Sequence, residues 1–159
     1  MEQNEFFYEI RWARKEDWNQ TVEMIWETFL KFEGKDYSEE GIRGFREFLT
    51  DGTLYNMFLN GEYPLAVAVM NQKMIGAGSL RNGNFLSLLF VEESYQKKGV
   101  GRALLASLCD YLKTEAGEKF IHLAAAPSAI GFYEKLGFRK TAEEQHVAGI
   151  RVTPMRRDL

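Results

Sequence analysis

The chain has 159 residues, of which 45% are hydrophobic, 14% aromatic and 27% charged. This length and composition are those of a globular chain that can bury a core without disulfides or metals, and they exclude an intrinsically disordered one. The net charge of −3 provides no basic footprint for phosphate backbones, so nucleic acid is not expected as a partner.

The N-terminal third predicts a strand and then helices. A strand is expected over residues 7–13, and Asp17 is placed to cap a helix whose pattern Gly34 interrupts. The apolar face of this helix consists of Trp18, Val22, Ile25 and Phe29. A second helix is expected over residues 38–49, and a short third one over residues 54–59. The buried face expected for the second helix consists of Ile42, Phe45 and Phe48.

The middle of the chain predicts three strands joined by tight turns. The apolar runs cover residues 65–70, 74–80 and 85–91. Asn71-Gln72 separates the first pair, and Asn82-Gly83 separates the second pair. Asn-Gly is typical of tight hairpins because both residues tolerate positive φ. These strands are therefore expected to form an antiparallel meander.

A long helix, a strand and a short helix are expected next. The long helix begins near Gly99 and ends at Gly117, and a strand follows over residues 120–125. The inner stripe of the long helix consists of Leu104, Leu108 and Leu112. Ser128 is placed to cap the short helix, which ends at Leu136-Gly137.

The C-terminal segment predicts a closing hairpin. It covers residues 145–157 and turns at Ala148-Gly149. Pro154 has no N–H to donate, so its strand is expected at a sheet edge or with a bulge. No repeat or linker interrupts the chain, and a single domain over residues 1–159 is expected.

One segment carries the pattern of an anion site at a helix start. It reads Gln96-Lys97-Lys98-Gly99-Val100-Gly101-Arg102 and lies between the strand ending at Val91 and the long helix. Glycines let the backbone approach a ligand closely, and the unpaired first-turn N–H groups lie at the positive end of the helix dipole. The two lysines and the arginine add mobile positive charge. A diphosphate is the expected ligand.

Two other phosphate motifs do not fit this segment. A dinucleotide fingerprint needs a third glycine where Leu104 stands, and a P-loop needs Gly-Lys followed by Ser or Thr. A helix start with glycines and solvated lysines is the structural alternative, which this segment alone leaves open.

A second motif lies further along the chain, where residues 129–138 read Ala-Ile-Gly-Phe-Tyr-Glu-Lys-Leu-Gly-Phe. Together with Gln96, Gly99, Gly101 and the strand over residues 88–91, this block resembles the GNAT superfamily of acyl-CoA N-acyltransferases. The resemblance covers residues 73–138, with weaker agreement at Glu9-Ile10-Arg11.

The resemblance implies an α/β (α+β) fold with a mixed, mostly antiparallel twisted sheet that splays open in the middle and has helices on both faces. It implies acetyl-CoA (coenzyme A) as co-substrate, with the pantetheine arm between the strands at residues 88–91 and 120–125. The expected cofactor-binding residues are Leu89, Phe90, Val91, Gln96, Lys97, Lys98, Gly99, Val100, Gly101 and Arg102.

Acetyl transfer to an amine needs an oxyanion donor, an acid for the departing thiolate and a base. Backbone N–H groups of Leu89 to Val91 are the candidate oxyanion donors, because they lie where two strands diverge. Tyr133 is the candidate general acid, since related members often use this tyrosine, and packing beside Phe132 is its alternative role. The strand over residues 84–91 has no acid, so no base is evident.

Glu92 and Glu93 follow that strand and are candidate bases, although carboxylates at a strand exit are more often solvated. The acceptor pocket is expected at the two N-terminal helices, where acidic residues favour a cationic amine. These acidic residues are Glu23, Glu27, Glu33 and Asp36.

The expected function is an N-acetyltransferase that acts directly on a primary amine of a small molecule or peptide. The alternative is a non-catalytic acyl-CoA-binding or sensing module. Ala126 leaves that alternative open, because many members carry an asparagine at this position that contacts the pantetheine.

Metal and membrane sites are not expected. Cys109 is the only cysteine, and His122 and His146 lack the spacing of metal ligands. The start, residues 1–5, lacks the pattern of a signal peptide, and no apolar run is long enough to span a bilayer. A cytoplasmic protein is expected, with a homodimer left open.

Overall fold

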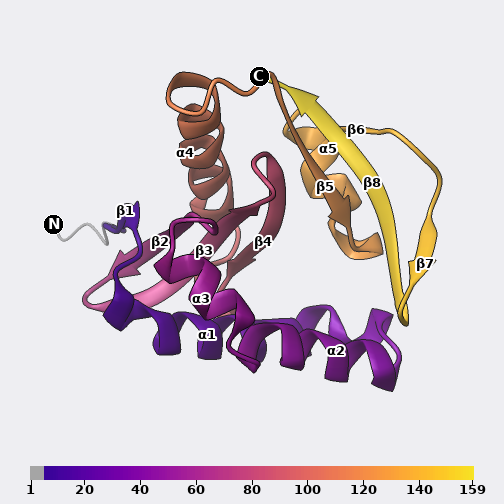
Figure 1. The fold of residues 1–159 in the computed structure, drawn as a ribbon, viewed down its shortest axis with the longest axis horizontal. Coiled ribbons are helices and arrows are strands. Elements are labelled where there is room, and N and C mark those ends of the chain that lie inside the picture. Colours follow the sequence, from indigo (N-terminus) through magenta and orange to yellow (C-terminus); the bar gives the residue numbers. More distant parts are fainter. Residues whose placement is uncertain (1–5) are drawn as a thin grey trace, which may run out of the picture.

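The computed structural model describes residues 6–159, whose eight strands run in the order β1-β2-β3-β4-β5-β8-β6, with β7 paired to β8 (Figure 1). The strands are β1 (Glu9–Trp12), β2 (Leu65–Met70), β3 (Lys73–Arg81), β4 (Phe85–Val91), β5 (Phe120–Ala125), β6 (Arg139–Lys140), β7 (Gln145–Val147) and β8 (Ile150–Asp158). The helices are α1 (Trp18–Phe32), α2 (Glu39–Thr50), α3 (Thr53–Leu59), α4 (Val100–Thr114) and α5 (Ile130–Lys135). The polar start, on which the expectation of no signal peptide rested, lies outside the described residues.

Strands β2 to β4 form the antiparallel meander that the sequence predicts. In the β2–β3 turn, Asn71 and Gln72 have φ angles of 50° and 68°, which match the right-handed twist of a tight hairpin. The register between β3 and β4 shifts after Ser79, so that Ser87 has no partner on β3. The extra residue of this bulge places Ser87 on the same side of the sheet as Leu88, so both side chains face the core beneath α1.

The sheet opens between β4 and β5, as the resemblance implies. These two strands run parallel and share one pair, Phe85 with His122, after which they diverge. β5 then pairs along its whole length with β8. The sheet therefore has a first half, β1 to β4, and a second half, β5 to β8, joined at one end of the splay (Figure 1).

Helices cover both faces of the sheet, and strand alternation sorts the two cores. In β2, Leu65 and Val67 pack with α1, α2 and α3, whereas Ala66 and Ala68 pack with α4. The α4 face is built of small residues. On β3, a Cβ added to Gly76 or Gly78 would come within 3.1 Å of a leucine side chain of α4, so these glycines permit the close approach.

Neither of the two predicted helix caps is found. Ser38, the first residue of the range expected for the second helix, does cap α2, since its hydroxyl accepts the Gly41 N–H at 3.1 Å. Asp17 does not cap α1: its carboxylate accepts from Arg11 and from the Arg14 N–H instead. Ser128 does not cap α5 either, because a 3-10 turn over residues 127–129 leads directly into that helix.

The expectation that the strand containing Pro154 lies at a sheet edge or has a bulge is wrong. β8 lies between β5 and β6 and keeps a continuous register with β5, so it is neither an edge strand nor bulged there. The Pro154 carbonyl accepts from Thr141, just past the end of β6. The backbone N and C=O of one strand residue point to the same side of the strand. The Pro154 nitrogen is therefore directed to the side of β6, beyond the end of that two-residue strand, and no hydrogen bond between β5 and β8 is lost.

The tip of the β7–β8 hairpin lies against the start of α2 (Figure 1). Gly149 has a φ of 81°, and its carbonyl accepts the Ser38 N–H at 3.0 Å. A Cβ added to Gly149 would clash with the Ser38 hydroxyl, and one added to Gly41 would lie 2.8 Å from the Gly149 carbonyl. Two glycines therefore allow the C-terminal hairpin to touch the N-terminal helix layer.

Candidate functional site

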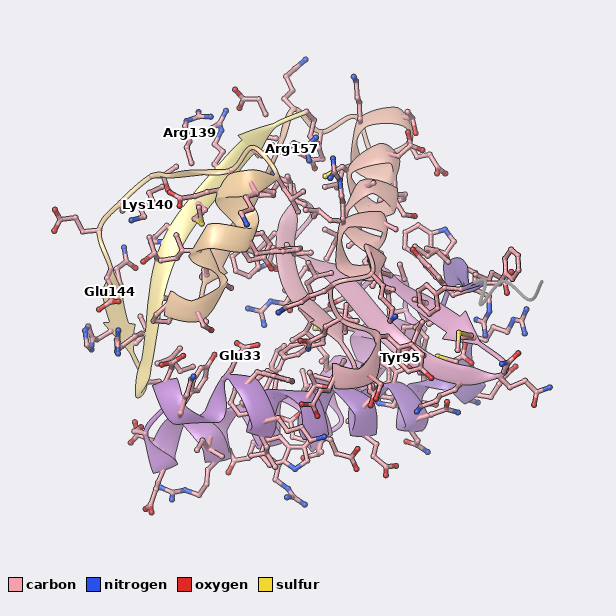
Figure 2. The ribbon with its side chains drawn as sticks, turned by 180° about the vertical axis from the view of Figure 1, so that it is seen from behind. Glu33, Tyr95, Arg139, Lys140, Glu144 and Arg157 are labelled. Carbon is pink, nitrogen blue, oxygen red and sulfur yellow. The ribbon has the colours of Figure 1, made fainter. Side chains whose placement is uncertain are left out.

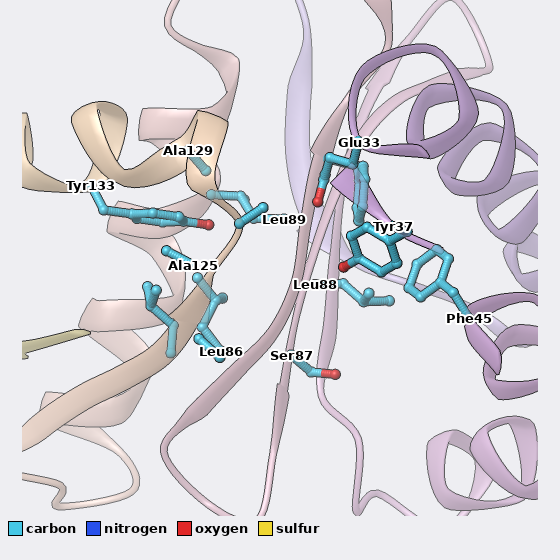
Figure 3. A pocket seen from close by; sticks show the side chains of 14 residues that line it. Glu33, Tyr37, Phe45, Leu86, Ser87, Leu88, Leu89, Ala125, Ala129 and Tyr133 are labelled. Carbon is cyan, nitrogen blue, oxygen red and sulfur yellow. The ribbon is translucent and has the colours of Figure 1, made fainter. Parts of the chain in front are cut away.

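Three cavities lie next to one another along β4. The central cavity, of about 110 Å³, lies between β4 and β5 (Figure 3). The loop cavity, of about 470 Å³, lies at the loop over residues 96–102 and shares Glu33 and Tyr133 with the central cavity. The hairpin cavity, of about 450 Å³, lies between α2 and the β7–β8 hairpin and shares Tyr37 and Phe45 with the central cavity. The central cavity therefore connects the two larger ones.

The loop before α4 has the backbone of an anion site. Gly99 is the N-cap of α4 with a φ of 87°, and Lys97 has a φ of 62°. No side chain caps this helix, so its first-turn N–H groups have no side-chain partner. Lys97 and Arg102 line the cavity beside these groups. The donors and the positive charge fit the pyrophosphate of coenzyme A.

The structure brings most of the expected coenzyme A residues to the loop cavity. Those that line it are Leu89, Val91, Gln96, Lys97, Gly99, Val100, Gly101 and Arg102, together with Tyr133. Phe90 lines the central cavity instead. Lys98 is exposed and lies with its Nζ 5.5 Å from the centre of the Phe6 ring, outside the lining of the loop cavity.

The edge of β4 that faces β5 has no strand partner beyond Phe85 among the described residues. At its far end, Gln96 Nε2 donates to the Val91 carbonyl at 2.8 Å, which fastens the loop to the strand. The rest of this edge, over residues 86–90, leaves backbone groups facing the splay. These groups can pair with an extended ligand, as a further strand would.

Tyr133 lies on α5 and points its hydroxyl into the splay, on the opposite side from Glu33 (Figure 3). The residue is 9% exposed, and no hydrogen bond to its hydroxyl is found among the described residues. Burial, and secondarily the charge of Glu33, raises the pKa of Tyr133, so the phenol stays protonated at neutral pH. The expected general acid thus faces the cavity that the reacting atoms would enter.

Glu33 follows α1 and faces Tyr133 across the central cavity, and Figure 2 shows it between the N-terminal helices and the second half of the sheet. Burial, and secondarily the charge of Asp36, raises the pKa of Glu33 to about 7. A carboxylate with such a pKa can accept a proton near neutral pH. The sequence suggested Glu33 only as one acidic residue of the acceptor region, because its opposition to Tyr133 depends on the tertiary fold.

The two candidate bases from the sequence lie elsewhere. The Glu92 side chain accepts the Ser94 N–H, which stabilises a turn at the exit of β4. Glu93 forms an exposed ion pair with Lys31 at 3.0 Å. Neither residue lines any of the three cavities. This agrees with the general expectation that carboxylates at a strand exit are solvated.

The acidic residues expected near the acceptor separate into two groups. Glu23 and Glu27 are exposed on α1 and line none of the three cavities. Asp36 is close enough to raise the pKa of Glu33, and its Oδ2 is buried without a hydrogen-bond partner. Of these four acidic residues, only Glu33 lines a cavity, and Asp36 acts on the site through the pKa of Glu33.

The hairpin cavity is formed by side chains from distant segments. Phe45 and Phe48 of α2 line it together with Arg81 at the end of β3 and Ser87 in the bulge of β4. The sequence predicted Phe45 and Phe48 as core residues. They do pack on the core of α1 and α3, but they are only half-buried because the cavity borders them.

Two other kinds of site are not found in the part of the chain that the structure describes. No helix between residues 6 and 159 is long and apolar enough to cross a bilayer. Within the same residues, no three of the His, Cys, Asp and Glu side chains gather as metal ligands would. Cys109 is buried with 8% exposure, and burial raises the pKa of its thiol.

Comparison with known proteins adds a family and a fold. The family model of the acetyltransferase (GNAT) domain matches residues 33–159. A Bacillus subtilis (strain 168) protein with a provisional acetyltransferase name is 28% identical over 139 residues, which cover 86% of each chain.

Solved structures of similar fold cover nearly the whole chain. A GCN5-related N-acetyltransferase from Rhodopseudomonas palustris superposes with a TM-score of 0.83 at 20% identity and covers 100% of both chains. A PaiA N-acetyltransferase from Thermoplasma acidophilum, solved in complex with coenzyme A, gives a TM-score of 0.82 at 21% identity and covers 97% of this chain and 100% of that one. At these identities the likeness shows a shared fold.

Proposed function

This chain belongs to the GNAT acetyltransferase family, and from that premise we propose that residues 1–159 form one acyltransferase domain that transfers an acetyl group from acetyl-CoA directly to a primary amine. The observation that carries the proposal is the opposition of Glu33 and Tyr133 across the central cavity. One group can accept a proton and the other can donate one, where a cavity lined by an anion-binding loop meets a cavity lined by aromatic residues.

Acetyl-CoA would bind with its pyrophosphate at the loop over residues 96–102. The first-turn N–H groups of α4, Lys97 and Arg102 would hold the phosphates. The pantetheine would extend along the open edge of β4 toward the central cavity. This path would bring the thioester between Leu89 and Tyr133, which both line the loop and central cavities.

The reaction we propose has no acyl-enzyme intermediate. Glu33 accepts a proton from the acceptor ammonium, and the neutral amine attacks the thioester carbonyl. The N–C bond forms as the C–S bond breaks, Tyr133 gives its proton to the thiolate, and the proton lost by the new amide returns the phenol to its protonated form. An unperturbed alkylammonium has a pKa of ~10.4, so transfer to a carboxylate of pKa about 7 is uphill in water. Loss of solvent around the ammonium in the cavity lowers that difference.

Backbone N–H groups of β4 would stabilise the oxyanion. The edge over residues 86–90 has no strand partner beyond Phe85 in the described part of the chain, so its N–H groups are fixed in place by the sheet and free to donate. Donors that are already oriented stabilise developing charge without reorganising during the step.

A single substitution tests whether Tyr133 is the acid. Tyr133→Phe should lower kcat by about 10²- to 10⁴-fold, the usual range for general acid catalysis, while acetyl-CoA affinity changes by less than about tenfold. Release of free coenzyme A thiol over a panel of amines, amino acids, polyamines and peptides measures turnover, and calorimetry measures affinity. Tyr111→Phe on α4 is the matched control, because Tyr111 is half-buried and lines none of the three cavities.

The same assay separates the enzyme from a binding module. Ala126, at a position where an asparagine is frequent in the family, leaves room for a non-catalytic acyl-CoA-binding protein as the second candidate. A wild-type chain that binds acetyl-CoA but releases no thiol with any acceptor would support the module. A Tyr133→Phe variant as fast as wild type would keep the enzyme and remove Tyr133 from the mechanism.

A further inference from the structure

The hairpin cavity is lined by a cation, Arg81, that forms no ion pair among the described residues. Arg81 ends β3, and its guanidinium carbon lies 5.3 Å from the centre of the Phe48 ring. Its Nε is buried and has no hydrogen-bond partner, and none of the ion pairs among the described residues includes Arg81. A buried guanidinium donor that is left unpaired costs free energy, so a ligand acceptor at this position would be stabilising.

A hydroxyl donor lines the same cavity. Ser79 donates to the Tyr63 hydroxyl at 2.7 Å, and Tyr63 donates to Ser87 Oγ at 2.9 Å. Ser79 is fully buried, and in this arrangement its hydrogen goes to Tyr63 and the Tyr63 hydrogen goes to Ser87. The hydroxyl hydrogen of Ser87 is the end of this chain, and Ser87 lines the central and hairpin cavities. It is available to donate to a ligand.

Apart from these donors, the hairpin cavity is mainly apolar. Phe45, Phe48, Ile150 and Val152 line it from α2 and β8. The other charged lining residue is Glu40, which is exposed on α2. The cavity thus offers a hydrophobic body site with two hydrogen-bond donors at the sheet, whereas Glu33 lines the neighbouring central cavity and not the hairpin cavity.

We infer that the acceptor amine carries a carboxylate at the other end of an apolar body, and that Arg81 and Ser87 bind this carboxylate. The inference rests on the proposed function, which places the reacting amine beside Glu33. A planar guanidinium matches a carboxylate in charge and geometry, and the Ser87 hydroxyl adds a second donor. The positive and negative ends of the site would then hold the acceptor in one direction.

The strand geometry sets the distance between the two ends. Arg81 pairs with Phe85, and Leu89, where we place the thioester, pairs with Gly78, which is three residues from Arg81 along β3. At ~3.3 Å per residue, this separation is about 10 Å, and the separation from Ser87 to Leu89 is about 7 Å. An acceptor that spans the site therefore has its amine and carboxylate roughly 7 to 10 Å apart, which excludes the α-amino group of a free amino acid.

A matched pair of probes tests the inference. We would use 3-[4-(aminomethyl)phenyl]propanoate and its primary amide, which share the reacting amine, the ring and the length, and differ in the charge. Wild-type protein should acetylate the amine of the carboxylate probe with a kcat/KM about 10- to 100-fold above that for the amide probe, because a site that pairs a charged group rejects the analogue that lacks it.

Variants locate the effect. Arg81→Met should reduce the ratio of kcat/KM for the carboxylate probe to that for the amide probe to about twofold or less. Arg46→Met is the matched control, because the Arg46 guanidinium carbon also lies 5.3 Å from an aromatic ring, that of Trp26, but Arg46 lines none of the three cavities. This control should keep the full preference. Thermal unfolding of both variants checks that the fold is intact.

The outcomes separate the inference from the proposed function. Equal kcat/KM for the two probes in wild type, or a preference for the amide, overturns the inference and leaves the proposed function intact. If the protein shows no turnover, calorimetric titration of the coenzyme A-loaded protein with the carboxylate probe measures acceptor binding instead. Binding that is lost in Arg81→Met but kept in Arg46→Met, without turnover, supports the inference and overturns the proposed function. No saturable binding and no turnover overturns both.

Discussion

The loop cavity and the hairpin cavity open from the same splay but are built from different parts of the chain. The loop cavity depends on backbone: a left-handed Gly99, the uncapped start of α4 and the short stretch over residues 96–102. The hairpin cavity depends on side chains, and its lining comes from α2, β3, β4 and β8. A ligand common to many relatives suits the first kind of site, and a ligand particular to one protein suits the second.

The central cavity belongs to neither kind. Three titratable side chains line it, and two of them, Glu33 and Tyr133, come from opposite layers and face each other across the cavity. Substitutions that alter one of the three cavities at a time can therefore separate coenzyme A binding, chemistry and acceptor binding.

The largest effect is expected in the central cavity. Glu33→Gln keeps the size of the side chain and removes the proton acceptor, so kcat should fall by about 10²- to 10⁴-fold with little change in acetyl-CoA affinity. Glu27→Gln is the control, since Glu27 is exposed on α1 and lines none of the three cavities. Wild-type turnover in Glu33→Gln would leave the base to water or to another residue.

The next effect is expected in the loop cavity. Gly101→Glu places a carboxylate where the pyrophosphate should lie, and coenzyme A affinity should fall on the order of 100-fold by calorimetry. A carboxylate in the first turn favours the helix itself, so loss of the fold is not the expected cause.

Gly101→Ala is the matched variant for the loop cavity, because an added Cβ would lie 3.4 Å from the Phe132 ring and 3.5 Å from the Val91 side chain, which is tolerable contact. Its loss of affinity should be much smaller than that of the charged variant. Unchanged affinity in a folded Gly101→Glu protein would place the phosphates elsewhere.

A smaller effect should follow pH. Burial and Asp36 raise the pKa of Glu33 to about 7, and the base acts only when deprotonated. Activity is therefore lost as pH falls: kcat/KM should decrease by about tenfold per pH unit below the pKa of Glu33 and bend toward a plateau above it. Glu33→Gln should remove this bend, whereas a limb caused by titration of the acceptor would persist in the variant.

The smallest effect is expected at the hairpin. Gly149→Ala should lower the free energy of unfolding by about 2 to 4 kcal/mol, since a left-handed residue costs about 1 to 2 kcal/mol and overpacking a similar amount. Gly52→Ala is the control, because Gly52 has a φ of 94° but open space around its Cβ position. The difference between the two, by denaturant unfolding, measures the clash with Ser38.

The hairpin variant should also separate the two large cavities. Displacing the hairpin should raise KM for the acceptor several-fold and leave coenzyme A affinity unchanged, because the hairpin does not line the loop cavity. Equal losses in both affinities would mean that the hairpin supports the whole splay.

Much of the fold could be predicted from the sequence because its patterns are local. The runs over residues 65–70 and 85–91 have the bounds of β2 and β4, and the α4 start at Val100 follows Gly99 as predicted. The helix caps were less accurate at Asp17, because a carboxylate can bind a nearby guanidinium, here that of Arg11 at 2.7 Å, in place of its own helix N–H groups. Pro154 was misplaced because strand order depends on β6, whose two residues have no detectable pattern.

Only part of the candidate site could be predicted from the sequence, for the same reason. The loop residues 96–102 are contiguous, so the sequence could predict a phosphate site there once the second motif at residues 129–138 was read with them. Glu33, Arg81 and Ser87 have no such pattern, because their roles come from their neighbours after folding. The pKa of Glu33 depends on burial and on Asp36, and the free donor of Ser87 depends on Tyr63 and on a bulge in β4.

The contact between Gly149 and the start of α2 has a consequence for the order in which the protein matures during synthesis. Chains are made from the N-terminus, and segments can pack only after they have left the ribosome. The two partners of this contact, Ser38 and Gly149, lie in the first and last thirds of the chain. A nascent chain released as far as α5 already contains every residue that lines the loop and central cavities, but it lacks Ile150 and Val152 of the hairpin cavity. The hairpin cavity is therefore the last of the three whose lining residues leave the ribosome.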